Sequence, residues 1–181
     1  MKSIVQNVLF TSSECDYFKN LIDFEDIKKM ESKVKGSFNL LVGAIPPSKI
    51  PNWFSERIKQ LGVLDIKFGD GFNTSRCLGI NRYSVGGYFR KHKDTTKGTK
   101  HSASSNINTR YKTLAVHLSN EHDSIGGDFT VGGIITDRTI GNCIIFDSSI
   151  DHEVLEIEKG TRYSLTLWLD RNDINEVRSL I

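Results

Sequence analysis

The sequence predicts an α+β fold, in which helices come first and a run of short strands then forms a β-sandwich or barrel backed by them. Two observations predict it. Apolar residues recur at helical spacing before Gly62, whereas short runs rich in Val, Ile, Thr and aromatic residues follow it. Helices and strands segregated along the chain are typical of this class. With 181 residues and no repeat or boundary, we expect one domain over residues 1–181.

Capping residues and apolar spacing predict two helices. Thr11 and Glu14 stand at capping-box spacing before an amphipathic stretch, which predicts a helix over residues 12–22. Pro51 suits the first helical position, and an apolar face continues from it to the next glycine, which predicts a helix over residues 51–61.

One short strand is predicted before the second helix and seven after it. These segments cover residues 38–42, 63–68, 76–83, 111–118, 127–131, 142–146, 151–157 and 161–169. The tail over 172–181 is a candidate short helix. The connection over 95–110 is long for a compact domain, and connections of this length are typically functional or mobile.

Composition excludes several classes of protein. A formal net charge of +2 argues against a dedicated DNA-binding protein. The three cysteines, Cys15, Cys77 and Cys143, form no CxxC pair, which favours reduced thiols over a disulfide scaffold or a zinc ribbon. The first ten residues lack the apolar run of a signal peptide, and no stretch is apolar for long enough to span a membrane. We therefore expect a cytoplasmic protein of a cell or of a virus-infected host, without a membrane partner.

Two histidines and one aspartate suggest a metal site. His92 and Asp94 are two residues apart, so their side chains share one face of a strand or converge just past its end. His152 stands at the start of a later predicted strand. Two histidines and a carboxylate form a facial triad with open positions, which suits non-haem Fe(II). Taken alone, the His-x-Asp pair is most simply a coincidence on the surface.

Arg162 strengthens the metal interpretation. It follows His152 across the turn-like sequence at 158–160 and lies in a strongly β-forming segment. A buried arginine needs an anion, and its guanidinium fork fits a carboxylate in bidentate fashion. The order of histidine, turn and arginine therefore predicts a site for a carboxylate-bearing cosubstrate beside the metal.

Five ordered blocks extend this pattern over roughly residues 76–170. They are RYSVGGYFRKHKD (82–94), YKTLAVHLSN (111–120), GGDF (126–129), GNCIIF (141–146) and HEV to GTRYSLTLW (152–168). In order and spacing they resemble the Fe(II)- and 2-oxoglutarate-dependent dioxygenases, in particular the prolyl 4-hydroxylase-like branch. The resemblance implies a double-stranded β-helix (jelly roll) flanked by N-terminal helices. Residues 1–62 would be mainly helical support and residues 63–170 the jelly-roll core.

The resemblance also implies roles for individual residues. His92, Asp94 and His152 match the iron ligands. Arg162 matches the basic residue that binds the distal carboxylate of 2-oxoglutarate, and Tyr83 matches a tyrosine that contacts this cosubstrate. The implied cofactors are Fe(II), 2-oxoglutarate and O₂, with ascorbate (vitamin C) as a supporting reductant.

The strand over 111–118 contributes one further face to the implied cosubstrate pocket. Thr113, Ala115 and His117 alternate along it, and the family lines the pocket with this face. The oxygen-sensing branch usually carries tyrosine where this chain has His117. This histidine either donates a hydrogen bond to the cosubstrate or is a satisfied core residue, and the sequence leaves both open.

Candidate substrate contacts are Tyr88, Arg90, Arg110 and Trp168, although packing is the simpler interpretation for Tyr88 and Trp168. Between Arg82 and Lys112 there are eight basic residues and one acid, a formal charge of +7. This segment is either a solvated basic lid or a means of attracting an acidic peptide or another anion. The nucleic-acid demethylase branch typically adds a second arginine at the position of Trp168, so its absence argues against a nucleic-acid substrate.

Three functional hypotheses follow. The first is a hydroxylase of prolyl residues in a peptide or protein, which releases succinate and CO₂. The second is a hydroxylase of a free amino acid or another small anionic metabolite, with the same site. The third is a non-catalytic member that binds a partner protein, and the intact triad with Arg162 argues against it.

Overall fold

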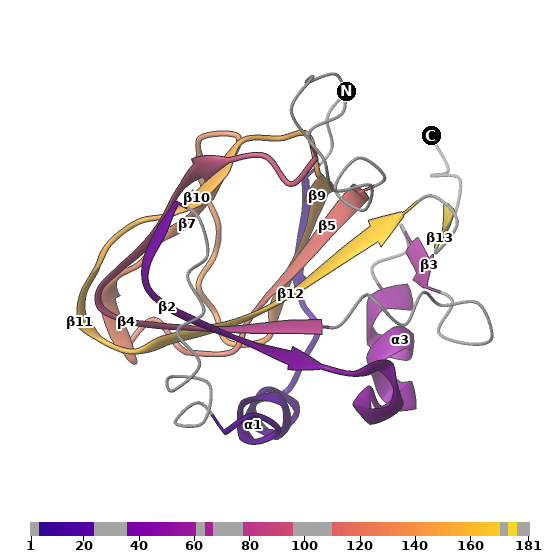
Figure 1. The fold of residues 1–181 in the computed structure, drawn as a ribbon. Coiled ribbons are helices and arrows are strands. Elements are labelled where there is room, and N and C mark those ends of the chain that lie inside the picture. Colours follow the sequence, from indigo (N-terminus) through magenta and orange to yellow (C-terminus); the bar gives the residue numbers. More distant parts are fainter. Residues whose placement is uncertain are drawn as a thin grey trace.

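Most strands of this protein form one curled sheet with helices on its outer side (Figure 1). The computed structural model describes residues 4–23, 36–60, 64–66, 78–95, 110–170 and 174–176. In chain order the elements are β1 (Ile4–Val8), α1 (Ser12–Asn20), β2 (Ser37–Ile45), a 3-10 helix η1 (Pro47–Lys49), α3 (Asn52–Lys59), β3 (Leu64–Ile66), β4 (Leu78–His92), β5 (Arg110–His117), β6 (Ser124–Gly126), β7 (Phe129–Val131), β8 (Ile134–Ile135), β9 (Asn142–Asp147), β10 (His152–Val154), β11 (Ile157–Gly160), β12 (Arg162–Asp170) and β13 (Ile174–Glu176).

Nine strands make up the main sheet. Their order is β1-β9-β5-β12-β4-β10-β7-β8, and β2 pairs with β4 beside this path. The described pairs are antiparallel. The sheet curls until its two ends face each other, because Phe129 of β7 lies 6.0 Å from Phe146 of β9, measured between ring centroids. Two small pairs, β11 with β6 and β13 with β3, complete the strands. The arrangement agrees with the predicted jelly roll.

Period-two alternation along β5, β9 and β12 divides the core into two clusters. One set of side chains packs toward the helices: Leu114, Val116, Cys143, Ile145, Leu165, Leu167 and Leu169. The alternate positions of β5 and β9 supply Ala115, Ile144 and Phe146 to a second cluster inside the curl. These strands therefore bury side chains on both faces, one toward the helices and the other inside the curl.

The two helices pack against each other through aromatic side chains on the outer side of the sheet. Phe18 of α1 lies 5.5 Å from Trp53 and 5.6 Å from Phe54 of α3, between ring centroids. The predicted capping box is confirmed, since Thr11 and Glu14 bond each other's backbone amides. Pro51 is the N-cap of α3 rather than its first helical residue, because its backbone is extended, with a ψ of 149°.

β4 is far longer than the strand predicted over 76–83, because it continues through an irregular bulge. Leu40 of β2 pairs with Tyr83, whereas Phe38, only two residues away on β2, pairs with Tyr88. The extra residues of β4 between these two pairs form the bulge. Gly86 adopts a φ of +77° within the bulge. A side chain at Gly87 would meet backbone carbonyl oxygens, so glycine is required there. Beyond the bulge, β4 continues as far as His92.

Three sequence predictions near the C-terminal end need correction. The strand predicted over 151–157 is split into β10 and β11, because the amide of Leu155 bonds the carbonyl of Asp128 instead of a ladder partner. The turn expected at 158–160 belongs to β11, which pairs with β6. Residues 174–176 form a strand, so the helix predicted over 172–181 is wrong there, and the rest of that tail lies outside the described residues.

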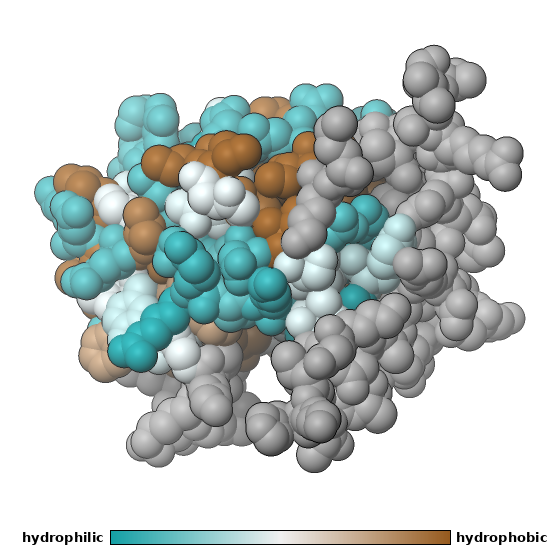
Figure 2. Space-filling model, turned by 90° about the horizontal axis from the view of Figure 1, so that it is seen from above, coloured by the Kyte–Doolittle hydropathy of each residue, from teal (hydrophilic) through white to brown (hydrophobic). Residues whose placement is uncertain are grey.

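The sequence did not predict three short strands, β1, β6 and β8. Each has five residues or fewer, and β8 exposes both of its side chains, so neither alternation nor burial marks it. Most of the predicted long connection lies outside the described residues, which resume at Arg110. No helix in the described parts of the chain is long and apolar enough to cross a membrane. Figure 2 shows one face of the molecule, where a band of hydrophobic residues lies between hydrophilic ones, as is ordinary for a folded protein.

Candidate active site

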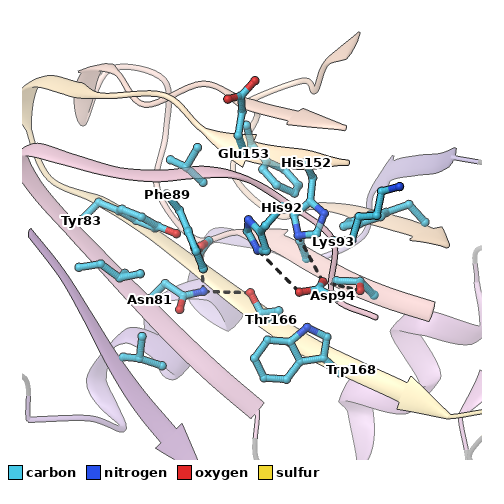
Figure 3. A pocket seen from close by; sticks show the side chains of 18 of the residues that line it. Asn81, Tyr83, Phe89, His92, Lys93, Asp94, His152, Glu153, Thr166 and Trp168 are labelled. Carbon is cyan, nitrogen blue, oxygen red and sulfur yellow. Dashed lines mark hydrogen bonds and ion pairs between the residues drawn. The ribbon is translucent and has the colours of Figure 1, made fainter. Parts of the chain in front are cut away.

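A cavity of about 510 Å³ lies inside the curl of the sheet (Figure 3). Its lining comes from β2, β4, β5, β7, β9, β10 and β12 and from the residues that follow β4. The volume is in the range of small-molecule sites in proteins. Four side chains singled out from the sequence line this one cavity, although they come from separate segments of the chain: His92 and Asp94, His152, and Arg162.

His92, Asp94 and His152 converge on one point of the cavity wall. Their potential ligand atoms all lie within 4.8 Å of one another. Nε2 of His152 is 3.3 Å from Oδ2 of Asp94, and Nε2 of His92 is 3.7 Å from Oδ1. The two histidines are direct partners in the pairing of β4 with β10. Asp94 lies just past β4, where its amide donates to the carbonyl of Ser148 at 2.9 Å. One strand pairing and one backbone hydrogen bond therefore assemble the cluster.

Backbone carbonyls orient both imidazoles of the cluster. Nδ1 of His92 lies 2.7 Å from the carbonyl oxygen of Arg90, and Nδ1 of His152 lies 3.0 Å from that of Ile150. A carbonyl only accepts, so Nδ1 carries the proton in each ring, and Nε2 of the neutral ring presents its lone pair to the cluster. This is the orientation that metal-binding histidines adopt.

The carboxylate of Asp94 is buried but well supported. Thr113 Oγ1 donates to its Oδ2 at 2.7 Å, and Ser148 Oγ lies 2.9 Å from the same threonine hydroxyl. Burial acts to raise the pKa of Asp94, but the hydrogen bonds from His152, in its protonated form, and from Thr113 outweigh it and the pKa is lowered. The aspartate therefore stays ionised, as a metal ligand must.

The pKa values of the two histidines are shifted in opposite directions. Burial and the neighbouring His152 lower the pKa of His92. Burial also acts to lower the pKa of His152, but its hydrogen bond to Asp94 and the charge of that group outweigh burial and raise it. His92 is thus held in the neutral, metal-binding form, and His152 is tied to the carboxylate.

Arg162 is a buried cation, and several of its N–H donors have no partner among the described residues. It is only 3% exposed and forms no ion pair with an acid of the described residues. Nη1 donates to Ser164 Oγ at 3.2 Å and Nη2 to His117 Nδ1 at 3.4 Å, while the buried Nε has no partner in the part of the chain that the structure describes. Burial lowers the pKa of Arg162 to about 10, although Tyr83 acts in the other direction. Such a group calls for an anion, and a carboxylate matches its fork.

The other predicted cosubstrate contacts surround Arg162. Its guanidinium carbon lies 5.3 Å from the ring centroid of Tyr83, a cavity residue. Burial raises the pKa of Tyr83 to about 12, so its phenol keeps its proton. Thr113 and Ala115 line the cavity from β5, and His117 lies on the same face of that strand beside the arginine.

Two of the four predicted substrate contacts lie in the cavity. Arg110 and Trp168 both line it, with the guanidinium carbon of Arg110 3.8 Å from the indole centroid. Tyr88 and Arg90 lie elsewhere on β4. The ring of Tyr88 stacks on the exposed Phe38, with centroids 6.0 Å apart. The guanidinium carbon of Arg90 lies 5.8 Å from the ring centroid of Tyr88. The structure therefore separates these four residues into two pairs.

Sequence reasoning missed several lining residues. Phe89 stacks on His92 with ring centroids 3.9 Å apart, and Phe146 meets His152 edge-on at 4.9 Å. The side chain of Asn81 donates to Thr166 Oγ1 at 2.9 Å (Figure 3). Strict alternation from the predicted Tyr83 and Arg162 could have found Asn81, Phe89 and Thr166.

The curled sheet, the cluster of two histidines and a carboxylate, and the buried arginine together define the class of 2-oxoglutarate-dependent dioxygenases. Residues 78–170, just over half of the chain, match the family model of the 2OG-Fe(II) oxygenase superfamily. The chain belongs to this superfamily. No curated protein sequence gave a significant match.

Solved structures share the fold. A prolyl-4-hydroxylase of Pseudomonas putida has a TM-score of 0.64 at 16% identity, with 94% of each chain covered. The viral collagen prolyl hydroxylase of Paramecium bursaria Chlorella virus-1, solved with 2-oxoglutarate, has a TM-score of 0.61 at 15% identity, with 92% of this chain and 94% of that one covered. A prolyl hydroxylase of Trichoplax adhaerens, solved with a peptide fragment, has a TM-score of 0.57 at 18% identity, with 94% of this chain and 84% of that one covered. The predicted jelly roll is confirmed.

The residues present fit the cofactors of this superfamily, Fe(II), 2-oxoglutarate and O₂. Two imidazole nitrogens and a carboxylate suit non-haem iron, and the unsatisfied guanidinium suits a carboxylate. When bound, the iron and cosubstrate would supply the oxidising power for oxygenase chemistry, and the protein would orient the reactants and exclude water. A role for ascorbate stays a prediction.

Proposed function

We propose that this dioxygenase hydroxylates a prolyl residue of a peptide or protein at an unactivated C–H bond. One oxygen atom of O₂ enters the new alcohol and the other enters succinate, as 2-oxoglutarate loses CO₂. The observation that carries the proposal is the presence of His92, Asp94, His152 and Arg162 around one cavity. In this proposal the first three residues are the iron ligands.

Arg162 is proposed to bind the distal carboxylate of 2-oxoglutarate. A guanidinium has five N–H donors, and only two of them have partners among the described residues. The remaining donors lie at a buried position, where a carboxylate that accepts two of them would offset the cost of the buried charge. Tyr83, next to this guanidinium, is the proposed second contact of the cosubstrate.

A prolyl substrate is supported by two observations. The structures most similar in fold include prolyl hydroxylases, one of them solved with a peptide fragment. The cavity also carries apolar side chains, including Leu40, Val42 and Val154, which suit a small apolar ring. Fold similarity alone does not decide the substrate, so the peptide has to be tested directly.

Release of succinate tests the proposed iron ligands. With Fe(II), 2-oxoglutarate and O₂, Asp94→Ala should abolish succinate release, because it removes the ligand that supports the cluster. Asp16→Ala is the matched control, since Asp16 is an exposed carboxylate of α1 that pairs with Lys19 away from the cavity. Full succinate release by Asp94→Ala would refute the ligand assignment.

A peptide panel tests the substrate. Peptides that contain proline should gain the mass of one oxygen atom, and the same peptides with alanine in place of proline should not. Hydroxylation of free amino acids without hydroxylation of any peptide would favour the second hypothesis. That alternative has its own support, since Lys93 and Arg110 place two cations in the cavity lining, where a small anionic metabolite could bind.

A further inference from the structure

A chain of buried hydrogen bonds leads from a backbone carbonyl to Arg162. The hydroxyl of Thr136 donates to the carbonyl oxygen of Phe129 at 3.1 Å. Nε2 of His117 lies 3.1 Å from the same hydroxyl oxygen, and Nδ1 of this histidine lies 3.4 Å from Nη2 of Arg162. All four residues are buried, so the chain is shielded from competing water.

Chemistry fixes the direction of each hydrogen bond in this chain. A carbonyl only accepts, so Thr136 uses its one proton on Phe129 and offers a lone pair to His117. A guanidinium only donates, so Nδ1 of the histidine must be bare where it meets Arg162. Both ends require the same tautomer of His117, with the proton on Nε2.

The charge state agrees with this assignment. Burial lowers the pKa of His117 well below its ordinary value, and the nearby Arg162 and Arg138 lower it further. The imidazole is therefore neutral, with one donor and one acceptor, and both are used inside the protein. Arg138 is itself held by Ser124 and Asp128, so it does not compete for the ring.

We propose that His117 is a positioning residue, which holds the guanidinium of Arg162 as an acceptor in a tautomer set by Thr136. Ser164 holds Nη1 and His117 holds Nη2, so the guanidinium plane is fixed from two sides. Nε and the second N–H of each terminal nitrogen remain for the carboxylate of 2-oxoglutarate. The proposal rests on the assignment of that carboxylate to Arg162.

This role differs from both interpretations that the sequence left open. A tyrosine hydroxyl at this position can donate a hydrogen bond to a carboxylate, whereas bare Nδ1 of His117 cannot. A histidine that served only to fill the core would not need the tautomer to match on both sides. The acceptor role instead orients the arginine before the cosubstrate arrives, which reduces the ordering cost of binding.

Heteronuclear NMR of nitrogen-labelled histidine tests the tautomer directly. The protein would be loaded with Zn(II), which is diamagnetic, and measured with and without 2-oxoglutarate. The His117 signals are those that vanish in His117→Phe. We expect Nε2 protonated and Nδ1 bare in both states. A proton on Nδ1 in the 2-oxoglutarate complex would make this histidine a donor and would overturn the proposal.

Affinity for 2-oxoglutarate tests the consequence for Arg162. Calorimetric titration without O₂, with Mn(II) in the site, should show an affinity about tenfold lower for His117→Phe and for Thr136→Val. The valine matches the shape of Thr136 but takes away the acceptor of the histidine proton, although it touches neither arginine nor cosubstrate. Thr136→Ser keeps the hydroxyl and should bind 2-oxoglutarate like the unmodified protein. Thr139→Val, which removes an exposed hydroxyl bonded to Asp137, is the control.

The outcomes separate this proposal from the proposed function. If Arg162→Met leaves 2-oxoglutarate binding intact, the assignment of the carboxylate itself fails. If Arg162→Met abolishes binding while His117→Phe and Thr136→Val bind normally, only the positioning role fails. Neither readout depends on the identity of the hydroxylated substrate.

Discussion

The hydroxyl of Thr113 donates a 2.7 Å hydrogen bond to Oδ2 of Asp94, and so ties the middle of the cavity wall to the candidate metal cluster. The resemblance to the family implied that this threonine lines the cosubstrate pocket. The structure shows that its hydroxyl is directed at the aspartate. Both residues are at most 5% exposed, so little water can replace this bond. Thr113 thereby fixes the rotamer of a proposed ligand.

Thr113→Val should weaken metal binding while leaving the fold intact. Groups that orient a metal ligand typically contribute ten- to a hundredfold in affinity, so a loss of about tenfold is expected. The measurement is a titration with Mn(II) followed by its paramagnetic resonance. Thr113→Ser keeps the hydroxyl and should bind metal like the unmodified protein. Equal affinity in the valine variant would show that Asp94 needs no such support.

Arg162→Met should remove the stabilisation that 2-oxoglutarate confers on the folded protein. A ligand at about a hundred times its dissociation constant stabilises the native state by about 2.7 kcal/mol, provided that it binds only that state. Without the buried guanidinium this increment should vanish, and Arg162→Lys should retain part of it, since lysine keeps the charge but lacks the fork. Thermal unfolding with Mn(II), with and without 2-oxoglutarate, measures the effect. The shift caused by metal alone should persist in both variants, and an unchanged 2-oxoglutarate shift would contradict the role of Arg162.

Two glycines with similar backbone conformations allow a matched test of stability. Gly141 has a φ of +81° and Gly133 a φ of +83°. A Cβ at Gly141 would collide with the backbone carbonyl of Phe10, whereas one at Gly133 would meet nothing within 4 Å. The left-handed conformation alone should cost each alanine variant about 1–2 kcal/mol.

Gly141→Ala should therefore lose clearly more stability than Gly133→Ala, by roughly a further 1–3 kcal/mol for the collision. Gly141 also joins the start of the chain to the jelly roll, because its carbonyl accepts from the amide of Leu9 and its amide donates to the carbonyl of His117. Urea unfolding of the two variants gives the difference. Equal losses would mean that the N-terminal segment moves aside without cost.

The sequence predicted the cluster because its members lie on strands whose spacing the motif preserves. His92 and Asp94 are neighbours in the chain, and His152 is brought to them by a regular antiparallel pairing. Local irregularities of the strands could not be predicted from the sequence. The bulge in β4 depends on contacts with Asn39 of β2, whose side chain bonds the carbonyl of Val85. No local pattern shows that contact, so the sequence could not tell that β4 continues through the bulge as far as His92.

The orientation of His117 was unpredictable for a related reason. Its partner Thr136 follows β8, a strand of two exposed residues that carries no periodic signal. Alternation along β5 placed His117 on the correct face, but its proton depends on a hydroxyl from another part of the sheet. Side chains on regular strands were thus predictable from spacing, and those that depend on short strands, bulges or loops were not.

The contact of Arg110 with Trp168 leads to a prediction about the substrate. Their separation of 3.8 Å is a cation–π contact, and Nη1 of the arginine also reaches the carbonyl oxygen of Asp94 at 3.4 Å. These contacts hold a cation in the cavity lining beside the proposed iron ligands. An acidic peptide should therefore bind better than a basic one, and increasingly so at low salt.

Arg110→Gln should raise the KM for an acidic peptide about tenfold and reduce its dependence on salt, while the KM for 2-oxoglutarate changes little. Loss of substrate attraction without loss of cosubstrate binding is the signature of a group that binds the substrate and not the cosubstrate. Lys91→Gln is the matched control, since Lys91 is an exposed cation of β4 that lies 3.7 Å from Glu153. If both variants raise the peptide KM equally, the effect comes from the overall positive charge of the segment. If neither does, Arg110 is held in place by Trp168 and Asp94 for the sake of the cavity wall, and the substrate is recognised by its shape.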